Sequence, residues 1–297
     1  MYSGEYPILI EPEDLSACLK DGDVLLVAVC TRKAFDSGHI PGSALIEPTE
    51  LICRVKPAVG KLPDISMLEK LFSSIGLKQS SRVIVYDDEG GGWAGRLIWT
   101  LDALGHSNSA LINGGFVAWQ NEGFPISVEQ VDLPTTEFNA QLNDSVIADI
   151  NDVSNSIDDE HTIVWDARAP EEYKGTKVTA LRNGHVPGAV NLDWINLMDS
   201  DNNLKLRDLN EIKYELEQQG ITEQVRVITH CLTHHRSGLT YFVGKLLGLD
   251  NPTVGEHMPL DLQFTKHFLQ FPLEFVCSVW FSRGLEVVNM LGHGGGK

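Results

Sequence analysis

The chain contains two copies of one sequence pattern, and this repeat restricts the possible folds more than any other feature. The motif Gly-His-Ile-Pro-Gly at Gly38–Gly42 recurs as Gly-His-Val-Pro-Gly at Gly184–Gly188. The run Arg82–Val85 recurs as Arg226–Thr229, in the same order and about half a chain later. Self-similarity of this kind indicates repeated structural units. Because 297 residues are enough for two domains of ordinary size, we predict two copies of one domain in tandem.

Each copy alternates short apolar runs with helical patterns. Leu25–Val29 and Thr162–Trp165 have the composition of strands that are buried on both faces. Val83–Tyr86 and Val225–Ile228 are similar, and each precedes a polar loop and a helical pattern. The second of these helical patterns spans Ser237–Leu247. The alternation predicts α/β domains, each with a mainly parallel sheet covered by helices on both faces.

A polar stretch, Val128–Asp144, separates the two copies and predicts a linker. We place the first domain at residues 1–130, the linker at residues 131–146 and the second domain at residues 147–297.

The last part of the second domain, residues 251–297, is atypical. The first copy closes with Ile112–Trp119, and we find no counterpart of this segment after Leu249. We therefore expect the second domain to lack its last strand and helix, and with them the aromatic wall over its active site. Either the lineage diverged here or the reading frame changed, and we favour the frame change because the break is abrupt. An uninterrupted frame in independent isolates would exclude it.

The composition argues against several kinds of partner. The net charge is −18, whereas nucleic acids and anionic membranes are bound by basic surfaces. No stretch has the roughly 20 apolar residues of a membrane-spanning helix. Met1–Asp14 lacks the basic start and apolar run of a secretory signal, so we expect a cytoplasmic protein. Five scattered cysteines do not form a disulfide framework.

The loop after the second Val-Ile strand carries the residues that we expect to do chemistry. Ligands of parallel sheets bind at the carboxyl ends of strands, and Cys231 stands at such an end. Helix N-termini, inward backbone N–H groups and neighbouring cations favour a thiolate there. The alternative is a structural cysteine beside a solvated turn. Our candidates are the nucleophile Cys231 and the loop residues Leu232, Thr233, His234, His235, Arg236 and Ser237.

The first copy lacks this chemistry. It has Asp87 where the second copy has Cys231. It also has Ala28 and Cys30 where the second copy has Asp166 and Arg168. We therefore expect a reaction in the second copy alone.

The spacing within the loop separates two kinds of chemistry. Cysteine-dependent phosphatases have five residues between their cysteine and arginine, whereas four separate Cys231 from Arg236. The tighter ring fits a single sulfur better than a tetrahedral phosphate. Cys231 and His234 have half of a zinc spacing, but no second Cys/His pair matches them, so we expect no metal.

Together these motifs resemble those of tandem rhodaneses. The resemblance rests on the two Gly-His-x-Pro-Gly motifs, on Asp166–Arg168 and on Cys231–Ser237, and it covers about Leu9–Leu249. The loop is most similar to the Cys-x-Thr-His-His-Arg loop of bacterial thiosulfate sulfurtransferases. The resemblance implies two rhodanese-like domains, of which the first, with Asp87, is inactive and the second is catalytic.

The resemblance also implies a two-step transfer of sulfur. Cys231 would take the outer sulfur of thiosulfate, a small anionic donor, and release sulfite. Cyanide or a thiol, such as that of a thioredoxin-like protein, would then remove the sulfur from the persulfide. No cofactor would take part. We expect Asp166 and Arg168 to form an ion pair near the loop, with either a structural or a functional role. Arg236 could hold the anionic donor or brace the loop by pairing with an acidic residue, and we favour the brace.

Two alternatives stay open. Enzymes for 3-mercaptopyruvate resemble a Cys-Gly-(Ser/Thr)-Gly-Val loop and carry an arginine where this chain has Glu172. Both differences point away from this donor, although Arg182 could still bind a carboxylate. A non-catalytic persulfide carrier or regulatory binding module would have nearly the same sequence, and rates with small donors would distinguish it.

Overall fold

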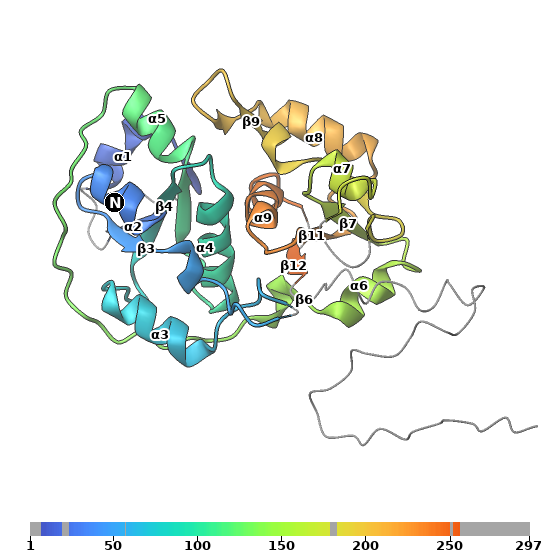
Figure 1. Cartoon of the computed structure of the whole chain (residues 1–297), viewed down its shortest axis with the longest axis horizontal. Helices are drawn as coiled ribbons and strands as arrows, with labels where there is room; N and C mark the ends of the chain where they lie inside the picture. Colours follow the sequence, from blue (N-terminus) through green and yellow to red (C-terminus); the bar gives the residue numbers. More distant parts are fainter. Residues whose placement is uncertain (1–6, 20–23, 57, 179–182, 250–251, 256–297) are drawn as a thin grey trace, which may run out of the picture. The chain divides into compact units, whose positions relative to one another are not determined.

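The computed structural model describes residues 7–19, 24–56, 58–178, 183–249 and 252–255 (Figure 1). Within these ranges the chain forms two five-stranded parallel sheets and one antiparallel pair of short strands. The first sheet has the order β1-β5-β4-β2-β3 and the second the order β6-β12-β11-β7-β8. The strands of the two sheets therefore correspond one to one, which confirms the predicted repeat and the α/β class.

The first sheet is covered on both faces. Its strands are β1 (Leu9–Ile10), β2 (Val24–Val29), β3 (Ala44–Ile46), β4 (Arg82–Asp87) and β5 (Ser109–Ile112), and its helical segments are α1 (Pro12–Cys18), α2 (Arg32–Ser37), η1 (Pro48–Glu50), α3 (Ile65–Ser74), α4 (Gly92–Ala103) and α5 (Gly115–Asn121). Leu25, Val27 and Val29 of β2 pack in a core with α3 and α4. Leu26 and Ala28 point to the other face and pack with α1, α2 and α5. The period of two along β2 thus places helices on both sides.

The second sheet repeats this arrangement. Its strands are β6 (Ile147–Ala148), β7 (Thr162–Asp166), β8 (Val190–Asn191), β11 (Arg226–His230) and β12 (Thr253–Gly255), its antiparallel pair is β9 (Met198–Asp199) with β10 (Lys205–Leu206), and its helical segments are η2 (Asp144–Val146), α6 (Ile150–Ser156), α7 (Pro170–Tyr173), η3 (Trp194–Leu197), α8 (Leu209–Gln218) and α9 (Arg236–Leu246). Helix α9 is the helix predicted over Ser237–Leu247, and left-handed Gly248 follows it with a φ of 71°.

One expectation about the C-terminal part was wrong. The last strand that we expected to be missing is present as β12, which lies between β11 and β6. Val254 in this strand is fully buried. Three residues suffice because β11 offers a parallel edge, so the strand forms without the motif that marks the end of the first copy. Residues 256–297, which include most of the atypical segment, lie outside the described residues.

The segment before the second sheet, residues 128–143, forms neither helix nor strand. Phe138 is buried and meets Phe72 of α3 edge-on at 5.6 Å. The Phe138 N–H also donates to Ser73 Oγ at 3.0 Å. This part of the segment therefore lies against the first domain, and the boundaries of the linker at residues 131–146 stay a prediction.

The two domains contact each other through α4 and α9. A Cβ on Gly95 would lie 2.5 Å from the Gly238 backbone, and a Cβ on Gly238 would lie 2.4 Å from the Arg96 nitrogen. Glycine is required for so close an approach. Lys245 and Asp102 add an ion pair of 2.7 Å between the same helices. Because α4 and α9 follow the loops at the ends of β4 and β11, this contact brings the two loops together.

No helix among the described residues is both long and apolar enough to cross a membrane.

Candidate active site

Cys231 lies directly after β11, and its side chain is 1% exposed. The loop continues to His235, and α9 begins at Arg236. His234 has a φ of 58°, so the chain turns through the left-handed region there. The chain therefore reverses its direction here, which places the start of α9 beside the sulfur.

Ser237 provides polar contacts to this sulfur. Its backbone N–H points at Cys231 Sγ with an N···S distance of 3.4 Å, and its Oγ lies 3.4 Å from the same sulfur. Ser237 is itself fully buried. The first turn of a helix also favours negative charge. This arrangement suits a sulfur that carries negative charge in a site shielded from solvent.

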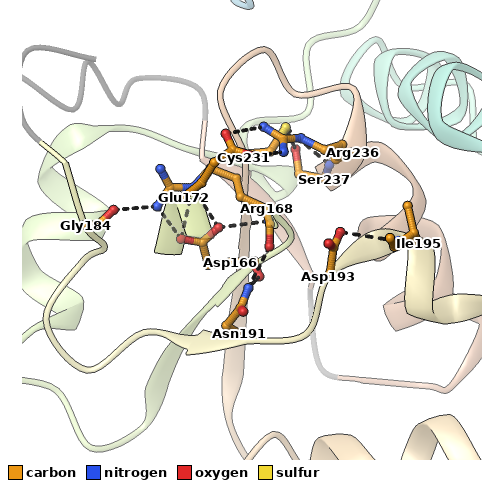
Figure 2. A network of polar contacts seen from close by, with 10 residues as sticks. All are labelled: Asp166, Arg168, Glu172, Gly184, Asn191, Asp193, Ile195, Cys231, Arg236 and Ser237. Carbon is orange, nitrogen blue, oxygen red and sulfur yellow. Dashed lines mark hydrogen bonds and ion pairs between the residues drawn. The ribbon is translucent and has the colours of Figure 1, made fainter. Parts of the chain in front are cut away.

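Arg236 forms the ion pair that we expected with an acidic residue. Its two terminal nitrogens donate to both Glu172 oxygens, at 2.6 and 3.2 Å (Figure 2). Glu172 is buried in α7, which raises its pKa, but the contacts with Arg236 outweigh this and hold the pKa below its ordinary value. Burial lowers the pKa of Arg236, whereas Glu172 and the nearby charge of Cys231 raise it, and the net direction is upward. Arg236 thus lies within electrostatic reach of the sulfur and is fixed by Glu172.

Asp166 and Arg168 also form the expected ion pair. Arg168 donates twice to Asp166, from Nη2 at 2.6 Å and Nε at 2.9 Å, and both side chains are buried. Arg168 Nη2 donates further to the Gly184 carbonyl at 2.8 Å (Figure 2). Asn191 donates to the carbonyls of both Asp166 and Arg168. The network joins the end of β7 to β8 and to the second Gly-His-x-Pro-Gly motif, and no contact between this ion pair and Cys231 is seen among the described residues.

His230, the last residue of β11, is buried next to this network. Neither of its ring nitrogens has a hydrogen-bond partner among the described residues. Burial lowers its pKa to about 4, since Asp166 opposes the shift only in part and the charges of Arg168 and Arg236 add to it. The ring is therefore neutral at pH 7.

The first domain contacts the Cys231 loop at two points. A Cβ on Gly60 would lie 2.7 Å from the Thr233 backbone, so the two main chains touch. His235 Nε2 contacts the carboxylate of Glu89, which lies in the loop after β4. Leu232, by contrast, is 39% exposed. The loop is thus held on one side by the first domain.

The corresponding loop of the first domain surrounds Asp87. Asp87 Oδ1 accepts the N–H groups of Glu89 at 3.1 Å and Gly91 at 2.8 Å, and Oδ2 accepts the Ala94 N–H at 3.0 Å. Burial and the charge of Glu89 raise the pKa of Asp87 to about 6, although these three N–H groups act in the opposite direction.

The structure brings most of the predicted site residues together. Cys231, Leu232, Thr233, His234 and His235 form one loop, and Arg236 and Ser237 begin the helix that follows it. Arg182 lies outside the described residues. The sequence analysis missed Glu172 and Glu89 as partners of the loop. It considered Glu172 only as a departure from mercaptopyruvate enzymes, and no sequence signal joins Glu89 to a histidine 146 residues away.

Comparison with known proteins identifies the family. Residues 11–122 and 149–254 each match the rhodanese-like domain. The chain is 40% identical over 242 residues to a thiosulfate sulfurtransferase from Azotobacter vinelandii, a match that covers 82% of this chain and 89% of that protein. It is 41% identical over 245 residues to a thiosulfate sulfurtransferase from Pseudomonas aeruginosa, again with 82% and 89% covered. The chain therefore belongs to the rhodanese family.

A solved structure shows the same fold at lower identity. The crystal structure of SseA from Escherichia coli, described as a 3-mercaptopyruvate sulfotransferase, superposes with a TM-score of 0.76. The match covers 85% of this chain and 98% of that one, at 22% identity. Both domains therefore have the rhodanese fold, as the resemblance implied.

Proposed function

We propose that the protein is a thiosulfate sulfurtransferase that moves a sulfur atom to cyanide or a thiol through a persulfide on Cys231. The observation that carries this proposal is the buried Cys231 with the Ser237 N–H directed at its sulfur and Arg236 close by. The relatives from Azotobacter and Pseudomonas, which have the same activity, support the choice of donor.

In the first step the Cys231 thiolate attacks the outer sulfur of thiosulfate. A new S–S bond forms while the S–S bond of thiosulfate breaks, and sulfite leaves with the electron pair. The Ser237 N–H and the start of α9 would stabilise the negative charge on the persulfide. Arg236 would favour approach of the anionic donor, since the chain as a whole is acidic.

In the second step the acceptor removes the outer sulfur. Cyanide attacks it and leaves as thiocyanate, and Cys231 returns as the thiolate. A thiol acceptor, such as that of a thioredoxin-like protein, would itself become a persulfide. The predicted cytoplasmic location fits this step, because reduced thiols are abundant there. The transfer through a covalent intermediate predicts ping-pong kinetics.

The remaining candidate residues would support the loop. Glu172 holds Arg236, and the pair of Asp166 and Arg168 holds the end of β7. Glu172 also argues against 3-mercaptopyruvate as donor. It places a carboxylate, already paired with Arg236, where such enzymes carry an arginine. We keep Arg182, which could bind a carboxylate, as a candidate supporting residue.

The test is turnover of thiosulfate and cyanide by the wild type and by Cys231→Ser. We expect equal amounts of sulfite and thiocyanate from the wild type and none above background from the variant. Cys30→Ser is the matched control and should keep full activity. Cys30 is buried in the first domain, and burial with the charges of Asp88 and Asp87 raises its pKa to about 12. Pyruvate release from 3-mercaptopyruvate without thiosulfate turnover would favour the other donor. Persulfide transfer without turnover of either donor would indicate a carrier.

A further inference from the structure

The side chain of His235 is enclosed by groups from both domains. Its Nε2 contacts Glu89 Oε1 of the first domain. Its ring lies 4.6 Å from the Trp93 ring of the first domain and 5.0 Å from the Trp194 ring of the second. A carboxylate can only accept a hydrogen bond, so Nε2 carries the proton. His235 is thus a rigid point in the catalytic loop, four residues after Cys231.

The loop that presents Glu89 is fixed by the residue that replaced the cysteine. The Asp87 carboxylate accepts the N–H of Glu89 itself, at 3.1 Å, and those of Gly91 and Ala94. These three bonds set the backbone from which the Glu89 side chain extends. The carboxylate of Asp87 therefore orders the loop of the first domain, although that loop has no nucleophile.

We propose that Glu89 is a positioning residue for sulfur transfer: its hydrogen bond to His235 holds the Cys231 loop in the geometry that the reaction needs. The inference rests on the proposed function of that loop. Asp87 contributes indirectly, since it orders the backbone that carries Glu89. In this account the inactive domain is a structural part of the active site.

A purely structural contact between domains is the competing interpretation, and the chain offers a matched control for it. Glu122, which follows α5 directly, pairs with Lys205 of β10 at 2.6 Å, so it also joins the two domains. Glu122 and Lys205 make no contact with the Cys231 loop among the described residues. Glu122→Ala therefore removes one carboxylate from the domain contact without touching the loop.

The experiment measures kcat/KM for thiosulfate in Glu89→Ala, Glu89→Gln, His235→Ala, the Glu89→Ala/His235→Ala double variant and Glu122→Ala. Small misplacements of reacting groups cost large factors in rate, and we expect a loss of about 10-fold in Glu89→Ala. Glu89→Gln keeps an oxygen that accepts the His235 N–H and should stay within about 3-fold of the wild type. The double variant should be no slower than His235→Ala, because Glu89 acts through His235. Glu122→Ala should match the wild type.

Hydrogen exchange of the amides in Cys231–Ser237 gives a readout that does not depend on the donor. We expect faster exchange in Glu89→Ala than in Glu122→Ala or the wild type. If the wild type lacks turnover but this difference in exchange appears, the proposed function fails while the ordering of the Cys231 loop by Glu89 stands. Wild-type kinetics in Glu89→Ala, equal losses in Glu89→Gln and Glu89→Ala, or multiplied losses in the double variant would each overturn the positioning role.

Discussion

The two strand–loop–helix units of this protein have the same place in the same fold but opposite chemical content. In the first, Asp87 stands at the end of β4 and its two oxygens bind three backbone N–H groups of its own loop. In the second, Cys231 stands at the end of β11, and its sulfur faces the Ser237 N–H with Arg236 nearby. In the first loop the carboxylate itself accepts the backbone N–H groups. In the second loop a backbone N–H can instead stabilise charge on the reacting sulfur.

The comparison also shows that the position of a residue does not define its role. The first loop carries no nucleophile, yet its Glu89 reaches His235 of the second. In our proposal the first copy supports the site and the second carries the chemistry. Four variants test how far this division of roles extends.

The largest effect is expected from Arg236→Ala. The change removes the cation beside Cys231 and leaves Glu172, which is 4% exposed, without its partner. We expect kcat/KM for thiosulfate to fall about 100-fold or more, with a loss of stability of roughly 3 kcal/mol from the unpaired buried carboxylate. Steady-state kinetics and urea unfolding measure the two effects. In the first domain the helix α4 begins with Gly92 at the position of Arg236. Unchanged activity in Arg236→Ala would mean that this difference between the two loops does not matter for sulfur transfer.

The second prediction concerns His230→Phe. The pKa of His230 is lowered to about 4 in the folded protein, so protons bind to the unfolded chain first as the pH falls below about 6.5. The wild type should therefore lose about 3 kcal/mol of stability, relative to the variant, between pH 6.5 and 4. At pH 7 the variant should be at least as stable, since the His230 ring nitrogens have no partner among the described residues. Denaturant midpoints at several pH values measure this, and parallel curves would contradict it.

The third prediction, for Asp87→Asn, has the opposite sign. The pKa of Asp87 is raised to about 6, so the folded protein keeps a proton that the unfolded chain releases above about pH 4. Relative to the variant, the wild type should lose about 3 kcal/mol as the pH rises from 4 to 6. Between pH 4 and 6 the effects of Asp87 and His230 on the stability of the wild type therefore have opposite signs. The contribution of His230 should become visible in Asp87→Asn, and that of Asp87 in His230→Phe. The same denaturation series checks both, and slopes of equal sign would refute the assignment.

The smallest effect is expected when a thiol is returned to the first loop. In Asp87→Cys/Cys231→Ser we expect no sulfur transfer above the background of Cys231→Ser. The first loop has Glu89 and Gly92 in place of a nearby arginine, and the carboxylate that orders its N–H groups would be lost. Sulfite release is the measurement. Activity above that background would show that the cysteine alone separates the two copies.

Much of this comparison was accessible from the sequence, because it depends on local patterns. The repeated motifs predicted two domains, and the position of Cys231 after a buried strand predicted the place of the loop. The pairing of Asp166 with Arg168 was also expected, since the two residues are two positions apart at the end of the strand.

What the sequence did not reveal depends on contacts between distant segments. Glu172 meets Arg236 across 64 residues, and Glu89 meets His235 across 146. The short strand β12 escaped detection because three residues carry too little pattern to be recognised. Burial of His230 between charged groups is likewise a property of the folded packing.

The central claim is that Cys231 carries the transferred sulfur, and mass spectrometry of the protein after exposure to thiosulfate alone tests it most directly. We predict that the peptide containing Cys231 gains the mass of one sulfur atom, and that cyanide removes it. Addition at Cys30 or Cys53 instead, or turnover without any addition to Cys231, would contradict the account.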